Sequence, residues 1–248
     1  QTESESEIQP LINISRSTDH LMKILTRQFH EEESSNLISG TAVLKIGKFR
    51  DQLRVFFDNS ISMIHEHRSL LLFTIIAATY KTDGHGKLMD VIKERAKNIV
   101  LSVDEIKYST LSFAAWQHLK NMDLDQELTD TKIYRYFRKF GNCGIDGIIL
   151  YLSEEFSFDH IQSNIETWTI ILEKCAQFLD AWFNRFDEII KPEKIISGNQ
   201  LSEILNIPAG PKIGIIKEAI TEAQIEKKIS TFDEAVAFAK QFLLDTVR

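Results

Sequence analysis

The sequence is poor in the two residue types that make tight turns, with 4 Pro and 10 Gly among 248 residues. β-Sandwiches and barrels need many such turns, so this scarcity argues against both. Cysteine is also rare: Cys143 and Cys175 show neither metal-site spacing nor a disulfide framework, which predicts two reduced thiols in a cytoplasmic protein. No apolar run reaches the roughly 18 residues that span a bilayer and no signal-peptide pattern occurs, so we expect no membrane partner.

Positive charge is in the minority, with 29 Lys and Arg against 36 Asp and Glu and a net charge of −7. Such a chain is not built as a general polyanion binder. We therefore expect no DNA partner, and any RNA contact must be confined to local basic patches. The hydrophobic fraction of 43% is enough to bury a substantial core. The chain begins with Gln1 rather than Met, which predicts a fragment or a processed product.

Apolar residues recur at helical spacing along most of the chain, and no stretch offers partner strands, so we predict an all-α fold. Residues 69–80 are apolar nearly all round, which is typical of a helix buried on most sides. Residues 165–190 predict one long helix that is closed by Pro192.

Residues 129–140 predict the one strongly basic and aromatic helix, which Gly141 ends as a C-cap. A basic stripe beside aromatic rings is the kind of surface that holds phosphates. The predicted RNA-binding stripe comprises Lys132, Arg135, Tyr136, Arg138 and Lys139. The alternative is a solvated face of a helix that packs on the core.

Residues 197–230 predict a helix, a tight turn and a second helix. Asn199 is the predicted N-cap of the first helix. That helix must stop before Pro208, and Pro211 suits the first position of the second helix, where its missing N–H is not needed.

The beginning of this second helix could bind a phosphate through its free N–H groups, with Lys212 nearby. Lys212 therefore joins the candidate RNA-binding residues. Gly214 inside the helix costs about 1 kcal/mol relative to Ala, so it needs a reason. We expect close packing of the turn; close approach of an RNA backbone is the alternative.

One local pattern here is specific enough to suggest a family. It is carried by Ser197-Gly198, Leu201, Leu205-Asn206-Ile207, Gly210-Pro211, Ile213-Gly214, Ala223-Gln224, Ile229, Thr231 and Glu234-Ala235. This pattern resembles the C-terminal end of bacterial tRNA nucleotidyltransferases, the CCA-adding enzymes and their A-adding and poly(A) polymerase relatives. Residues 133–138 and 141–146 resemble the body of the same enzymes, so the resemblance covers roughly 69–244. It implies a helical body that holds tRNA behind a catalytic head.

Two departures from the family pattern decide the expected activity. The family's HD motif holds metal ions that activate water, but Ala77 and Ala78 stand in its place and supply no ligand atoms. We expect the remaining histidines to be ordinary residues. His65 and His67 are then a solvated pair, His85 lies in a turn and His118 lies in a helix. We expect no metal site from the residual His85 and His118.

The second departure is the nucleotidyltransferase head, whose Gly-Gly and strand-borne Asp-x-Asp are missing. Asp123-Leu124-Asp125 has the Asp-x-Asp spacing but lies in a polar link between helices, so we interpret it as a solvated turn. We expect no cofactor for this chain, because Mg²⁺ would belong to a head on a missing N-terminal segment or a separate chain. The chain alone is not expected to transfer nucleotides.

These observations predict four parts. They are a partly frayed N-terminal lead (1–30), a degenerate HD-like helical subdomain (31–128), a helical body (129–192) and a small helix-turn-helix-like C-terminal tail (193–248). The expected function is a non-catalytic RNA-binding or RNA-positioning region with tRNA as partner. One alternative is a structural or regulatory protein-interaction domain derived from the family without RNA binding. A third is an HD-type metal-dependent phosphohydrolase.

Overall fold

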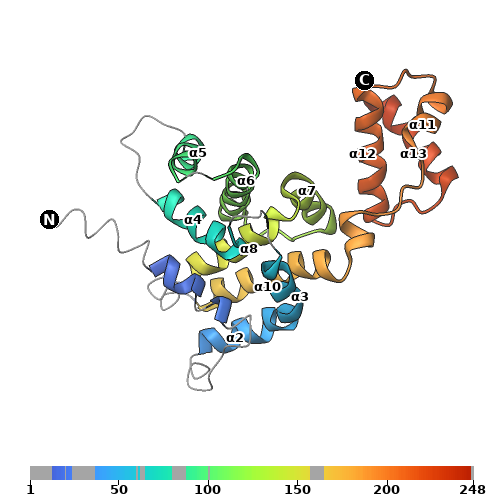
Figure 1. Cartoon of the computed structure of the whole chain (residues 1–248). Helices are drawn as coiled ribbons and strands as arrows, with labels where there is room; N and C mark the ends of the chain where they lie inside the picture. The colour runs from blue at the N-terminus through green and yellow to red at the C-terminus, as the bar shows by residue number, and fades with distance from the viewer. Residues whose placement is uncertain are drawn as a thin grey trace. The chain divides into compact units, whose positions relative to one another are not determined.

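The computed structural model describes residues 13–19, 21–23, 37–59, 61, 65–79, 88–99, 101–156 and 165–246. These residues form helices, turns and loops without a strand, which confirms the predicted all-α fold (Figure 1). Most of the predicted lead and His85 lie outside the described residues. The chain divides into two units by its internal contacts: unit 1 comprises 1–127 and 139–180, and unit 2 comprises 128–138 and 181–248.

Unit 1 is organised around α8 (Cys143–Glu155), in which every residue from Cys143 to Ser153 is buried. A helix that is largely apolar all round is stable only when neighbours cover it on most sides. Helix α6 (Val103–Lys120) packs along α8, and both α4 (His67–Thr79) and α5 (Leu88–Asn98) pack on α6. The other helices are α2 (Leu37–Ile46), the 3-10 turn η2 (Gly47–Phe49), α3 (Arg50–Asp58) and most of α10 (Ile165–Phe183).

Unit 2 has its own apolar core. It comprises most of α7 (Asp130–Phe140), the end of α10, the π-helical turn η3 (Phe186–Ile190), α11 (Gly198–Leu205), α12 (Pro211–Ile225) and α13 (Phe232–Thr246). Helices α11, α12 and α13 pack on one another. Their buried residues include Leu201, Ile213, Ile216, Ile220, Ala223, Ala235 and Ala239.

The predicted helix, turn and helix at 197–230 is present, but Asn199 is not its N-cap. Ser197 caps α11: its Oγ accepts from the Gln200 N–H at 3.3 Å, and its own N–H donates to Gln200 Oε1 at 2.9 Å. This reciprocal capping box satisfies two helix-start donors and so wins over a lone Asn199. Helix α11 ends at Leu205, and Pro211 is the first residue of α12, both as predicted.

The predicted continuous helix over 165–190 is wrong. Helix α10 ends at Phe183, and the chain re-forms as a π-helical turn from Phe186. Arg185 breaks the helix at φ −124° and ψ 30°, and its guanidinium binds Asp130 of α7, with Nη2 2.5 Å from Oδ2. The apolar spacing continues across this break, so periodicity alone does not reveal it.

Candidate nucleic-acid interface

The predicted basic stripe on α7 is exposed except at Tyr136. Lys132, Arg135, Arg138 and Lys139 are all exposed, whereas Tyr136 is only 2% exposed. Tyr136 lies about 40° around the helix axis from both the exposed Lys132 and the buried Phe140, so helix geometry alone does not decide its side. Its ring packs edge-on against the ring of Phe137, with the two centroids 5.1 Å apart. The prediction that Tyr136 belongs to the RNA-binding surface is therefore corrected: its side chain is part of the core.

The two arginines of the stripe bind carboxylates of α12. Arg135 donates from Nε and Nη2 to the two oxygens of Glu222, both at 2.6 Å, and Arg138 pairs with Glu218. The paired hydrogen bonds to Glu222 raise the pKa of Arg135 further above its ordinary value. Their positive charge is thus largely compensated within unit 2.

These pairs belong to a regular row of contacts, here called the α7–α12 seam. From Thr131 to Arg135 to Arg138 along α7, the partners on α12 run backwards through Glu226, Glu222 and Glu218. The two helices are therefore antiparallel along the seam. Sequence reasoning missed it, although a detectable signal exists: three glutamates at a spacing of four residues line one face of a helix.

One end of the seam opens into a pocket of about 340 Å³, here called the basic pocket. Helix α7, the loop after η3 and helix α12 line it, through Tyr134, Arg138, Ile190, Lys191, Pro192, Lys194, Gly214, Lys217, Glu218 and Thr221. Four cations thus surround a single carboxylate, that of Glu218. Among the described residues, no ion pair involves Lys191, Lys194 or Lys217. Unlike the arginines of the stripe, these lysines remain available to an anion.

Gly214 faces this pocket, and its surroundings contradict the expected close packing. A Cβ built at Gly214 would meet no atom within 4 Å. The residue is exposed and lies within α12, with no left-handed backbone to require glycine. The alternative reason, close approach of an RNA backbone, stays a prediction. Lys212 is exposed at the second position of α12 but does not line the pocket.

The positions of the family's metal site offer no ligand set. Ala77 and Ala78 lie in α4, and His118 lies exposed near the end of α6, its ring 5.5 Å from that of Phe140. Burial and the charge of Lys139 lower the pKa of His118. No group of three or more His, Cys, Asp or Glu side chains among the described residues could hold a metal ion.

The interpretation of His67 as a solvated residue is wrong. His67 is 2% exposed, and its Nε2 lies 2.7 Å from Oδ1 of the buried Asp146. Ser112 donates to the other Asp146 oxygen at 3.0 Å, and the Tyr108 hydroxyl lies 3.2 Å from His67 Nε2. Burial, followed by the charge of Asp146, raises the pKa of Tyr108.

This buried network is not a nucleophilic triad. In a triad the histidine stands between the serine and the carboxylate, whereas here Asp146 stands between Ser112 and His67. All three side chains are 2% exposed or less, so a substrate cannot reach them. We therefore assign the network to the stability of unit 1.

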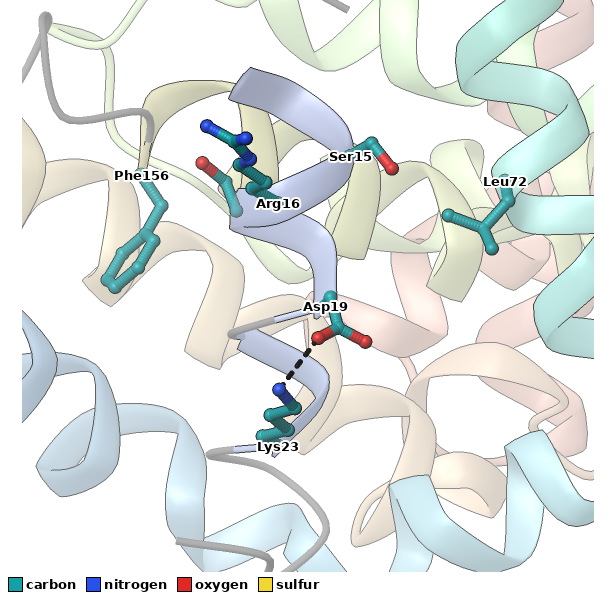
Figure 2. Close-up of a pocket in the computed structure, with 7 residues that line it drawn as sticks. Ser15, Arg16, Asp19, Lys23, Leu72 and Phe156 are labelled. Atoms are coloured by element: carbon teal, nitrogen blue, oxygen red, sulfur yellow. Dashed lines mark ion pairs between the residues drawn. The ribbon is translucent and has the colours of Figure 1, made fainter. Parts of the chain in front are cut away.

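A second pocket, of about 570 Å³, lies in unit 1 and is lined by Ser15, Arg16, Ser17, Asp19, Lys23, Leu72 and Phe156. Figure 2 shows the ion pair between Asp19 and Lys23 of this lining, whose charged atoms lie 2.9 Å apart. Phe156 and Leu72 lie on opposite sides of this view. Asp19 also pairs with Arg68, and these contacts lower its pKa. The lining of this pocket has two cations, Arg16 and Lys23, against one carboxylate, whereas the basic pocket has four against one.

Comparisons with protein-family models, with curated proteins and with solved structures yield no match. No helix among the described residues is both long and apolar enough to cross a membrane. The fold and the site together define an all-α protein with a basic pocket in its C-terminal unit.

Proposed function

We propose that this chain is a non-catalytic helical region that binds or positions RNA, with tRNA as its partner, in a protein of the tRNA nucleotidyltransferase kind. The observation that carries the proposal is the basic pocket, where four cations converge on one cavity of unit 2. The sequence resemblance to the tRNA-holding part of those enzymes supports it independently. A tRNA partner implies a cytoplasmic location.

The distribution of charge supports the choice of unit 2. Unit 2 has 12 Lys and Arg against 11 Asp and Glu, which gives +1, whereas unit 1 has 17 against 25, which gives −8. Charges separated by more than about 8–10 Å are largely screened at physiological salt, so attraction to RNA must arise at short range. The basic pocket supplies that short-range attraction in an otherwise acidic chain.

We propose a non-catalytic role for the chain because the residues present do not fit a metal centre. Ala77 and Ala78 have no lone pair to offer where the related enzymes have a metal-binding His and Asp. We derive no reaction step through a metal, and the phosphohydrolase alternative has no supporting observation among the described residues.

One observation favours the second candidate, a structural or regulatory protein-interaction domain without RNA binding. Arg135 and Arg138 already bind Glu222 and Glu218, so half of the cations predicted for the α7 stripe form ion pairs within unit 2. In that reading the stripe stabilises the α7–α12 seam and has no ligand.

Binding of tRNA, followed by fluorescence anisotropy at low ionic strength, separates the two candidates. We expect the double variant K191E/K194E to bind at least about tenfold more weakly than the wild type, because four units of charge change at the pocket. The matched control is Lys240→Glu, an exposed lysine of α13 outside the pocket, which should change affinity by less than about twofold.

Equal, negligible binding of tRNA by the wild type and all variants at low salt would contradict the RNA proposal. Co-purification of a protein partner without RNA would then favour the second candidate.

A further inference from the structure

The chemistry of the basic pocket identifies the group it is built to take. Lys191, Lys194 and Lys217 line one small cavity, and three positive charges so close together repel each other unless an anion lies between them. A phosphate carries one negative charge in the RNA backbone and up to two at a chain end, and its several acceptor oxygens can bind several of these donors at once. A single carboxylate would satisfy fewer of them.

The size and lining of the pocket argue for a phosphate group rather than a whole nucleotide. A volume of about 340 Å³ lies at the low end of small-molecule sites. Tyr134 is the one aromatic residue of the lining, and it is 8% exposed, so no open ring face is available for stacking a base. Contact with a phosphate alone carries no base specificity.

Glu218 is the one anion already in the pocket. Its carboxylate pairs with Arg138, and the Tyr134 hydroxyl donates to its Oε2 at 3.3 Å. It therefore occupies the guanidinium that would otherwise form paired hydrogen bonds to a phosphate. An incoming phosphate must either leave Arg138 with Glu218 or displace that carboxylate.

We propose that the basic pocket binds a phosphate group beside Gly214, and that the phosphate displaces Glu218 from Arg138. Glu218 is then an intramolecular competitor that keeps phosphate binding weak. Gly214 leaves the space into which the phosphate moves, since a side chain there would project into open volume. The inference rests on the proposed function only for the source of the phosphate, which is the RNA backbone if that function holds and a free phosphate compound if it does not.

The chain offers a matched control for the competitor. Glu222 lies one turn further along α12 and also binds an arginine of α7, but it does not line the pocket. Removing charge at Glu218 should strengthen phosphate binding, whereas the same change at Glu222 should not. Lys217→Met has its own control in Lys240→Met, an exposed lysine of α13 outside the pocket.

Inorganic pyrophosphate is the first probe, titrated into the full chain by calorimetry, and tRNA is the second. We expect Glu218→Gln to bind pyrophosphate about five- to tenfold more tightly than the wild type, and Lys217→Met at least about fivefold more weakly. Glu222→Gln and Lys240→Met should stay within about twofold of the wild type. Thermal melting of each variant checks that it is folded, and the exposed Lys194→Gln replaces Lys217→Met if that variant is not.

The outcomes separate the two proposals. Pyrophosphate binding with the expected pattern but no tRNA binding supports the phosphate pocket and overturns the RNA function. Binding of tRNA that is unchanged in both Glu218→Gln and Lys217→Met overturns the pocket and leaves the RNA function standing. Equal pyrophosphate affinities for Glu218→Gln and Glu222→Gln overturn the role of Glu218 as competitor.

Discussion

At the scale of single residues, the buried His67–Asp146 pair is a point on which the stability of unit 1 depends. Both side chains are almost fully buried, at 2% and 1% exposed. Taking ionisable groups out of water is costly, and only mutual attraction and further hydrogen bonds offset that cost. Ser112 and Tyr108 supply those bonds, so each member depends on the others.

Replacing Asp146 by Ala should lower the free energy of unfolding by about 3–5 kcal/mol, because His67 and Ser112 would lose their shared buried partner. Urea unfolding followed by circular dichroism measures the change. The control is Asp90→Ala, which removes an exposed pair with Lys93 at 3.9 Å and should cost less than about 1 kcal/mol. Equal losses of unfolding free energy in the two variants would show that the buried network stabilises unit 1 no more than an exposed ion pair does.

No sequence pattern could have identified this pair. His67 and Asp146 are 79 positions apart, and two histidines before an apolar helix are just as typical of a solvated turn. Tyr136 was misplaced for a related reason. Tyr136 stands at the border of two helix faces, equally close to the exposed Lys132 and the buried Phe140, so its side is decided by packing that the sequence does not show.

At the scale of elements, the beginning of α11 illustrates what sequence can reveal when the right pattern is applied. Ser197 and Gln200 form the S-x-x-Q signature of a capping box, which is readable without a structure. The helix positions, the stop before Pro208 and the start at Pro211 all follow from local rules of this kind. The α7–α12 seam does not, because it depends on which distant helices pack together.

The cap yields a direct test. Ser197→Ala should lower the free energy of unfolding by about 1 kcal/mol, because the Gln200 N–H loses its acceptor. Asn199→Ala, two residues on, should change it by less than about 0.5 kcal/mol, because Asn199 is exposed within the first turn. Thermal unfolding of both variants decides between the two caps. A larger loss of stability for Asn199→Ala than for Ser197→Ala would identify Asn199 as the N-cap.

Gly214 supports a second test on α12. If its glycine serves a ligand rather than packing, Gly214→Ala should raise the free energy of unfolding by up to about 1 kcal/mol, because alanine favours the helix. Gly40→Ala is the matched control, since Gly40 is also an exposed helical glycine with nothing within 4 Å of an added Cβ. Destabilisation by Gly214→Ala alone, measured by urea unfolding, would return close packing as the reason for this glycine.

At the scale of the whole molecule, the uneven distribution of charge sets the character of any RNA complex. Unit 1 is acidic and repels a polyanion, whereas unit 2 is nearly neutral and gathers its cations at one pocket. Composition alone predicted that RNA contact must be local. It could not say where, because Lys191 and Lys194 come from a loop, and Arg138 and Lys217 from two helices that meet only in the folded unit.

This distribution predicts a shallow salt dependence. Each phosphate that is neutralised releases counterions, so the single phosphate held by the basic pocket gives a slope of log K against log salt of about −1. Anisotropy titrations of tRNA over a range of salt concentrations measure the slope. Lys217→Met should make it shallower, and Lys240→Met should leave it unchanged. A slope steeper than about −6 would mean that a far larger surface binds RNA than the basic pocket provides.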